Sequence, residues 1–274
     1  MRTQRHENPQ WSNIQQHLVD RATATSQQME GQGDLLRIRR FPEDAMDYYN
    51  AAMQRGGVTT GLLIKIGLTE LELHNIAFAE SYFHRAVKMD RKNPEGWNAL
   101  GATEHLQRQY GAAVSYYKRA VKLDKANAIF HVNLSTAYFE VKDYKNGRKQ
   151  AAEALKLDPL VYQRGSGMGI TIQILSMEDR ARFAYEMAKL YAKSGKEEDM
   201  LHSLSVASEN GLDILAAMAK DPDLAKYRLD PRVALVVMTA KSLHEGNKPP
   251  VTANTAALTP RKDAVLPPAN PSQR

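Results

Sequence analysis

Apolar residues recur at three- and four-residue steps between residues 26 and 161, in runs separated by short polar turns. This spacing places the apolar side chains on one face of a helix, so it predicts a series of amphipathic helices. The clearest stretch, 94–127, reads as two such helices. One helix pair cannot bury its own apolar face, so we expect the pairs to stack on one another.

The same pattern returns at a constant period along this part of the chain, about 34 residues. Gly67 and Gly101 occupy equivalent positions in successive copies, and so do Phe83 and Tyr117. Small residues let two helices approach closely, and an aromatic ring fills the space beside them. Four units in one register are therefore predicted, at 26–59, 60–93, 94–127 and 128–161.

This register resembles the tetratricopeptide repeat (TPR) family, in which a small eighth residue and a later aromatic residue mark each unit. The segment 94–127 matches the family pattern except at Lys125, where Pro is common. The segment 128–161 has Pro159 at that position but carries Ala151 where the aromatic residue is usual. The resemblance implies an all-α superhelical solenoid of antiparallel helix pairs, which serves to hold another protein.

The N-terminal segment 1–25 is expected to form a further helix. Trp11, Ile14, Leu18 and Ala22 would share one face of it. Two alternatives remain open: the helix caps the array, or it packs only in an oligomer.

The C-terminal part contains a degenerate fifth unit and a closing helix. A connector with several glycines, 162–180, precedes a unit at 181–214. Asp-Pro pairs at Asp221 and Asp230 are typical helix starts, and the second is expected to open a capping helix at 232–243 within the segment 181–245. This end resembles segments that close TPR arrays in large multidomain and bacterial proteins. The Pro-containing tail 246–274 has no periodicity and is expected to be disordered.

The amino-acid composition and charge exclude some kinds of functional site and make others less favoured. The sequence has no cysteine, which excludes thiol nucleophiles and Cys-ligated metals. The net charge is +6. Half of this positive excess lies in the tail, and the remainder is spread over three repeats among acidic residues. This distribution argues against a dense basic face. Nucleic-acid binding is therefore a remote alternative.

No stretch of the sequence approaches the roughly 20 apolar residues that a membrane span needs. The first thirty residues also lack the apolar core of a signal peptide. A cytoplasmic location is therefore expected from the sequence as it stands. A signal peptide removed earlier, or a misplaced start, would instead be consistent with the periplasm.

Catalytic and cofactor sites are not predicted. The glycines at 165–169 lack the Gly-Lys-Ser/Thr ending of a phosphate loop. The eight histidines show no metalloprotease spacing, and nothing places a serine on a strained turn. We expect no enzyme activity, no cofactor and no metal.

The resemblance implies that the first helix of each unit lines a concave groove. Residues of these helices that point away from the core are the predicted ligand contacts. Asn98 and Asn133 are the strongest candidates, because an amide can pair with the backbone of a bound peptide. Leu71 could equally belong to the core, as could Ile129. The full candidate set is Lys65, Leu68, Glu72, Asn98, Ala102, His105, Ile129, Asn133, Thr136 and Glu140.

A chaperone-tail site is not expected. TPR domains of that type hold two carboxylates with Lys and Asn from their first unit. Here those positions hold Ile64 and Leu68, or Glu30 and Asp34 in the unit before. The leading hypothesis is thus a scaffold that binds a different peptide or helix. The alternative is a self-associating subunit, because the Trp11 helix or the apolar stretch 233–237 could pair with a copy of itself.

Overall fold

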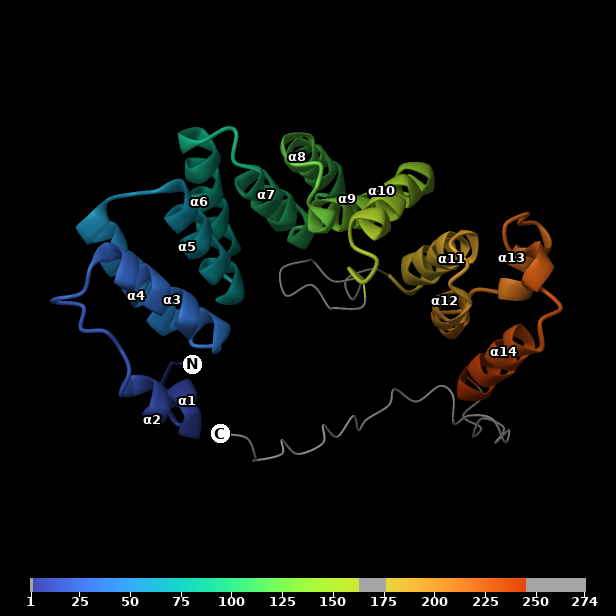
Figure 1. The fold of residues 1–274 in the computed structure, drawn as a ribbon, viewed down its shortest axis with the longest axis horizontal. Helices are drawn as coiled ribbons and strands as arrows, with labels where there is room; N and C mark the ends of the chain where they lie inside the picture. Colours follow the sequence, from blue (N-terminus) through green and yellow to red (C-terminus); the bar gives the residue numbers. More distant parts are fainter. Residues whose placement is uncertain (1, 163–175, 245–274) are drawn as a thin grey trace, which may run out of the picture.

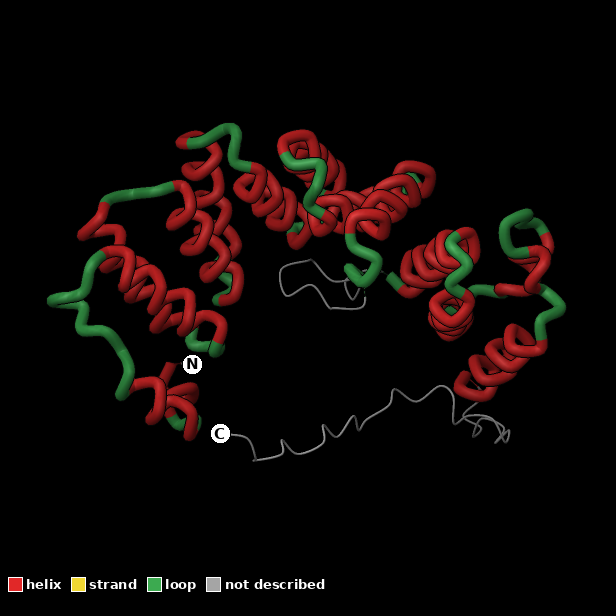
Figure 2. Tube along the Cα trace, viewed as in Figure 1, coloured by secondary structure: helices red, strands yellow, loops and turns green. Residues whose placement is uncertain are grey.

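The computed structural model describes residues 2–162 and 176–244. All regular secondary structure in these ranges is helical, as predicted (Figure 2). Predictions for most of the connector, at 163–175, and for the tail at 246–274 fall outside the described residues. No helix in the described part is long and apolar enough to cross a membrane.

The four predicted units form four consecutive helix pairs, which follow one another along an arc (Figure 1). The first helices of the units are α3 (Ser26–Ile38), α5 (Thr60–Glu72), α7 (Pro94–Leu106) and α9 (Ala128–Glu140). The second helices are α4 (Pro42–Gly56), α6 (Ile76–Met89), α8 (Tyr110–Leu123) and α10 (Tyr144–Leu157).

Each first helix starts at a capping residue that occupies the same position in every unit. Thr25 and Thr59 accept backbone N–H groups three residues on, at 3.2 and 3.1 Å. Asn93 accepts from Gly96 at 3.0 Å, and Asn127 accepts from Ile129 at 3.0 Å. These side chains satisfy N–H groups that the helix itself leaves free, which fixes where each helix begins.

The two helices of each of the first three units are held together by a glycine facing an aromatic ring. A Cβ on Gly33 would lie 2.5 Å from the ring of Tyr49, and one on Gly67 would lie 2.4 Å from that of Phe83. The same contact joins Gly101 to Tyr117, at 2.6 Å. The glycine and the ring are therefore complementary, and the two helices pack at a distance that no larger residue would allow.

The fourth unit reverses this arrangement. Its second helix carries Gly147, and a Cβ there would lie 2.6 Å from the ring of Phe139 in the first helix. Ser135 stands where the other units have glycine, and its hydroxyl donates to the carbonyl of Gly147 at 2.8 Å. The aromatic residue absent at Ala151 is thus supplied from the other helix of the pair.

The N-terminal segment packs on the first unit and forms two short helices, α1 (Arg2–His6) and α2 (Pro9–Gln15). Trp11 stacks on His6 with ring centroids 3.8 Å apart and lies 5.0 Å from the ring of Phe41. Ile14 is buried, whereas Ala22 is exposed. The expectation of one helix extending to Ala22 is therefore wrong, because α2 ends at Gln15.

The C-terminal part continues the array with α11 (Met177–Lys193) and α12 (Glu197–Glu209). The helix α13 (Ile214–Ala219) begins at the capping residue Asp213, a start that the sequence analysis missed. Asp221 opens only a turn and the short 3₁₀ helix η2 (Ala225–Tyr227).

The predicted closing helix is α14 (Pro231–His244). It packs against the apolar core of the last pair, where Val233 is fully buried. Val236 and Val237 pack partly on the same core. The stretch considered for self-association is therefore used largely within the chain.

The close approach of α3 and α4 is testable with two glycines of α3. We expect Gly33→Ala to lower the free energy of unfolding by about 1–3 kcal/mol, because the added methyl would overlap the buried Tyr49 ring. Gly31→Ala, with nothing within 4 Å, should instead raise it by about 0.5–1 kcal/mol. Urea unfolding followed by circular dichroism measures both. Equal effects of the two substitutions would contradict the role given to the glycine–ring contact.

Candidate functional site

The predicted site residues lie on the first helices, where polar side chains of successive units contact one another. Four of these contacts join positions with the same sequence separation, 35: Lys65 with Glu30, Glu72 with Arg37, Asn98 with Asn133, and His105 with Glu140. This separation is one more than the repeat period, so each contact links one position to the position after its equivalent in the next unit. The first-helix face is therefore connected by polar pairs across neighbouring units.

In the second unit, Lys65 is held by two carboxylates of the first unit. Its Nζ donates to Glu30 Oε1 at 2.7 Å and to Asp34 Oδ2 at 2.6 Å. Burial alone lowers the pKa of Lys65, but these bonds outweigh it and raise the pKa above its ordinary value. Lys65 and both acids are thus already engaged with one another, although each remains partly exposed.

Glu72 occupies the end of the same helix. Arg37 of the first unit approaches it, with Nε 3.8 Å from Oε1. Burial raises the pKa of Glu72, and the nearby arginines oppose that shift. Leu68 and Leu71 both pack against the core of their unit while staying partly exposed.

At the centre of the first-helix face, the amides of Asn98 and Asn133 are hydrogen bonded. Asn133 Nδ2 donates to Asn98 Oδ1 at 2.9 Å. Asn133 is 1% exposed, and its own Oδ1 is buried with no hydrogen-bond partner among the described residues. Asn98 is half-buried, so it is the accessible member of the pair. The candidates Ala102 and Ile129 are also partly exposed.

Burial corrects the prediction that every candidate side chain is open to a ligand. Asn133, Thr136 and His105 are each about 1% exposed, and the Thr136 hydroxyl donates to the carbonyl of Val132 at 3.0 Å. The helix α9 is buried on nearly all sides because the chain returns over it after α10. Val161 packs with Val132, and Tyr162 packs partly on the same cluster.

His105 and Glu140 form a second buried pair. His105 Nε2 lies 3.9 Å from Glu140 Oε1, and neither ring nitrogen is hydrogen bonded within the described residues. The ring of Tyr110 meets His105 edge-on at 5.1 Å. Burial lowers the pKa of His105 to about 4, so the ring is neutral at physiological pH. Burial and the charge of Asp179 raise the pKa of Glu140.

A cavity of about 440 Å³ lies between α11 and α12. Tyr162, Phe183, Met187 and His202 are among its lining residues. None of the predicted site residues lines it. Sequence reasoning missed this cavity because the fifth unit departs from the register that located the first four.

The fold and the first-helix face define a TPR-type helical solenoid, and comparisons with known families agree. A family model described as the fourth ARM domain of tetratricopeptide repeat protein 21 matches residues 98–248, more than half of the chain. A tetratricopeptide repeat model matches residues 64–128. The chain therefore belongs to the tetratricopeptide repeat family, as the sequence resemblance suggested. No curated protein matches it significantly.

Solved structures with a similar fold include the APC/C hetero-tetramer Cut9–Hcn1, with a TM-score of 0.50 and 16% identity over 78% of this chain and 36% of that one. A thermophilic TPR protein of Thermus thermophilus aligns with a TM-score of 0.49 and 18% identity, over 78% and 99% of the two chains. MamA of Desulfovibrio magneticus RS-1 gives 0.47 and 16%, over 68% and 94%. At these identities the likeness concerns the fold alone.

The buried imidazole predicts a pH dependence of stability. The folded-state pKa of His105, about 4, lies below the unfolded value near 6.5. Its stabilising contribution is therefore complete above pH 6.5 and is lost as the pH falls toward 4. Between pH 7 and pH 5 the loss should be about 2 kcal/mol, and His105→Gln should abolish that part of it.

Urea midpoints of the wild type and His105→Gln at the two pH values test this. Glu140 is present in both proteins, so its own titration cancels to first order in the comparison. An equal loss of stability in the two proteins would contradict the account of His105.

Proposed function

We propose that this protein is a non-catalytic interaction scaffold that binds a peptide or helix of a partner along its first-helix face. Membership of the TPR family supports the general role, since TPR proteins are generally non-catalytic scaffolds. The observation that carries the proposal is the amide pair of Asn98 and Asn133. Asn98 is accessible, and its own amide N–H groups donate to no other group among the described residues.

The arrangement suits recognition of a peptide backbone. An amide N–H donates to a carbonyl whatever the neighbouring side chain is, and the hydrogen bond from Asn133 fixes the Asn98 rotamer before a ligand arrives. Ala102 leaves room beside it, and the partly exposed Leu68 and Ile129 provide apolar contact.

The charge of the first helices specifies the ligand further. Across α5, α7 and α9 there is one basic residue, Lys65, which is already paired with acids. The acidic residues of these helices are Glu70, Glu72, Glu95, Glu104 and Glu140. A neutral or basic peptide is therefore favoured as the ligand. We still predict that the protein does not bind the carboxylate-ended tail of a chaperone.

Peptides selected from a random library against the protein test the site. Asn98→Ala should weaken their binding by about tenfold, the loss expected for a well-formed hydrogen bond at a partly buried site. Asn50→Ala removes a comparable amide from α4, a second helix, and should leave the affinity unchanged. Fluorescence anisotropy measures both. If the selected peptides bind Asn98→Ala as well as they bind wild type, the first-helix site is wrong.

A further inference from the structure

The structure separates charges that the sequence interleaves. In the three units spanning 60–161, the second helices α6, α8 and α10 carry nine lysines and arginines but only two acids, Glu80 and Glu153. The first helices of the same units carry one lysine and five glutamates. The sequence argument against a dense basic face overlooked this difference between the two sets of helices. That argument averaged the charges of residues that are close together in the sequence but lie on two different surfaces of the fold.

Six of these nine basic residues lie at equivalent exposed positions of the three helices, which together we call the second-helix crest. It consists of four positions at helical spacing in each of α6, α8 and α10, and all of them are exposed. Six of the twelve are lysines and none is acidic. The crest residues are Ala77, Ser81, His84, Lys88, Gly111, Ser115, Lys118, Lys122, Lys145, Lys149, Ala152 and Lys156.

Most of these lysines form no ion pair within the described part of the chain, unlike Lys65 of the first helices. Lys156 has only an exposed contact with Glu153 at 3.5 Å. No ion pair joins the other five crest lysines to an acid within the described residues. A lysine in the last turn of a helix, such as Lys122, is stabilised by the helix dipole. That reason does not apply to Lys145 and Lys149, which stand in the first two turns of α10, where the dipole disfavours a cation.

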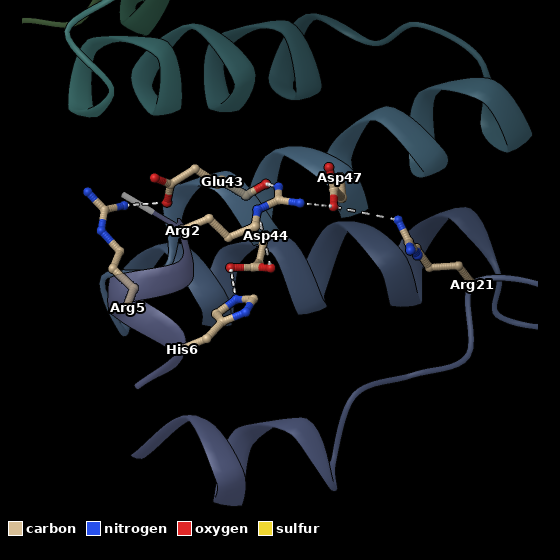
Figure 3. A network of polar contacts seen from close by, with 7 residues as sticks. All are labelled: Arg2, Arg5, His6, Arg21, Glu43, Asp44 and Asp47. Carbon is tan, nitrogen blue, oxygen red and sulfur yellow. Dashed lines mark hydrogen bonds and ion pairs between the residues drawn. The ribbon is translucent and has the colours of Figure 1, made fainter. Parts of the chain in front are cut away.

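The first unit shows how such a crest is covered. Its equivalent positions on α4 include Glu43 and Asp47, and the basic N-terminal segment lies across them (Figure 3). Arg2 Nη1 lies 3.1 Å from Asp47 Oδ2, and Arg5 is paired with Glu43. The neighbouring Asp44 accepts from His6 at 2.9 Å. A short polypeptide of opposite charge therefore occupies this crest within the molecule itself.

We propose that the crest of α6, α8 and α10 is a second docking surface, which binds an acidic polypeptide segment of a partner protein. The charge signs are the reverse of those on α4, so the segment that fits carries Asp or Glu in place of Arg. A membrane is a poorer match, because the crest has none of the Trp, Phe or Leu side chains that insert at an interface. A single-stranded nucleic acid would need aromatic rings for stacking, and the crest positions hold no Trp, Tyr or Phe.

A labelled peptide of about 20 residues, alternating Glu and Ser, is a suitable probe, with the matching Gln–Ser peptide as its control. Fluorescence anisotropy should show binding of the Glu peptide alone, weakening as salt rises. Lys118→Glu with Lys122→Glu should weaken it by at least about tenfold. Lys220→Glu with Lys226→Glu makes the same change in net charge at exposed positions off the crest, and should cost less than about twofold.

A second crest variant, Lys145→Glu with Lys149→Glu, keeps the test valid if the first does not fold, as judged by circular dichroism. No binding of the Glu peptide at low salt, or equal losses in the crest and off-crest variants, would overturn the proposal. Tighter binding of phosphatidylserine vesicles or of an oligonucleotide than of the peptide would also overturn it. Because the first-helix site is not touched by these variants, the library-selected peptides should bind them normally.

Discussion

The close approach of the two helices in each unit is the constraint on which the rest of the structure depends. A glycine in one helix lies so close to an aromatic ring of the other helix that a Cβ atom on the glycine would overlap the ring. This contact fixes how the two helices lie together, and so fixes which side of each helix remains for the neighbouring unit. The fourth unit keeps the contact while exchanging its partners, with Gly147 against Phe139. The requirement is therefore for a complementary pair of shapes, and either helix can supply the ring.

Once the helix pairs are fixed, the offset between units determines the polar contacts of the first-helix face. The same offset brings four pairs together, and the contacts differ in character from unit to unit. Lys65 and Glu72 belong to charged groups, Asn98 belongs to an amide pair, and His105 belongs to a buried pair whose ring nitrogens have no hydrogen-bond partner among the described residues. Among these contacts, the amide pair combines a fixed rotamer with an accessible member. For that reason it is a better candidate for ligand contact than the charged groups, whose members are already bound to one another.

The same geometry sorts charge between two surfaces. First helices use their polar residues to contact one another, and the lysines of the second helices remain exposed to solvent. In the first unit two of the equivalent positions, Glu43 and Asp47, are acidic and are paired with the protein's own N-terminal segment. The two faces therefore differ both in charge and in whether their side chains are already paired, so they suit partners of different chemistry.

The sequence by itself determined the architecture. The recurrence of Gly67 and Gly101, and of Phe83 and Tyr117, located four helix pairs and the family, because backbone periodicity and close packing are local requirements that each unit repeats. It also located the closing helix through Asp230-Pro231. Only the tertiary structure decided which polar residues are accessible. Asn133 and His105 are buried where they meet polar groups of neighbouring first helices, and Thr136 lies on α9, against which Val161 and Tyr162 pack. The sequence did not reveal the second-helix crest for a related reason. Basic and acidic residues that are interleaved along the chain are separated only when the first and second helices place them on different surfaces.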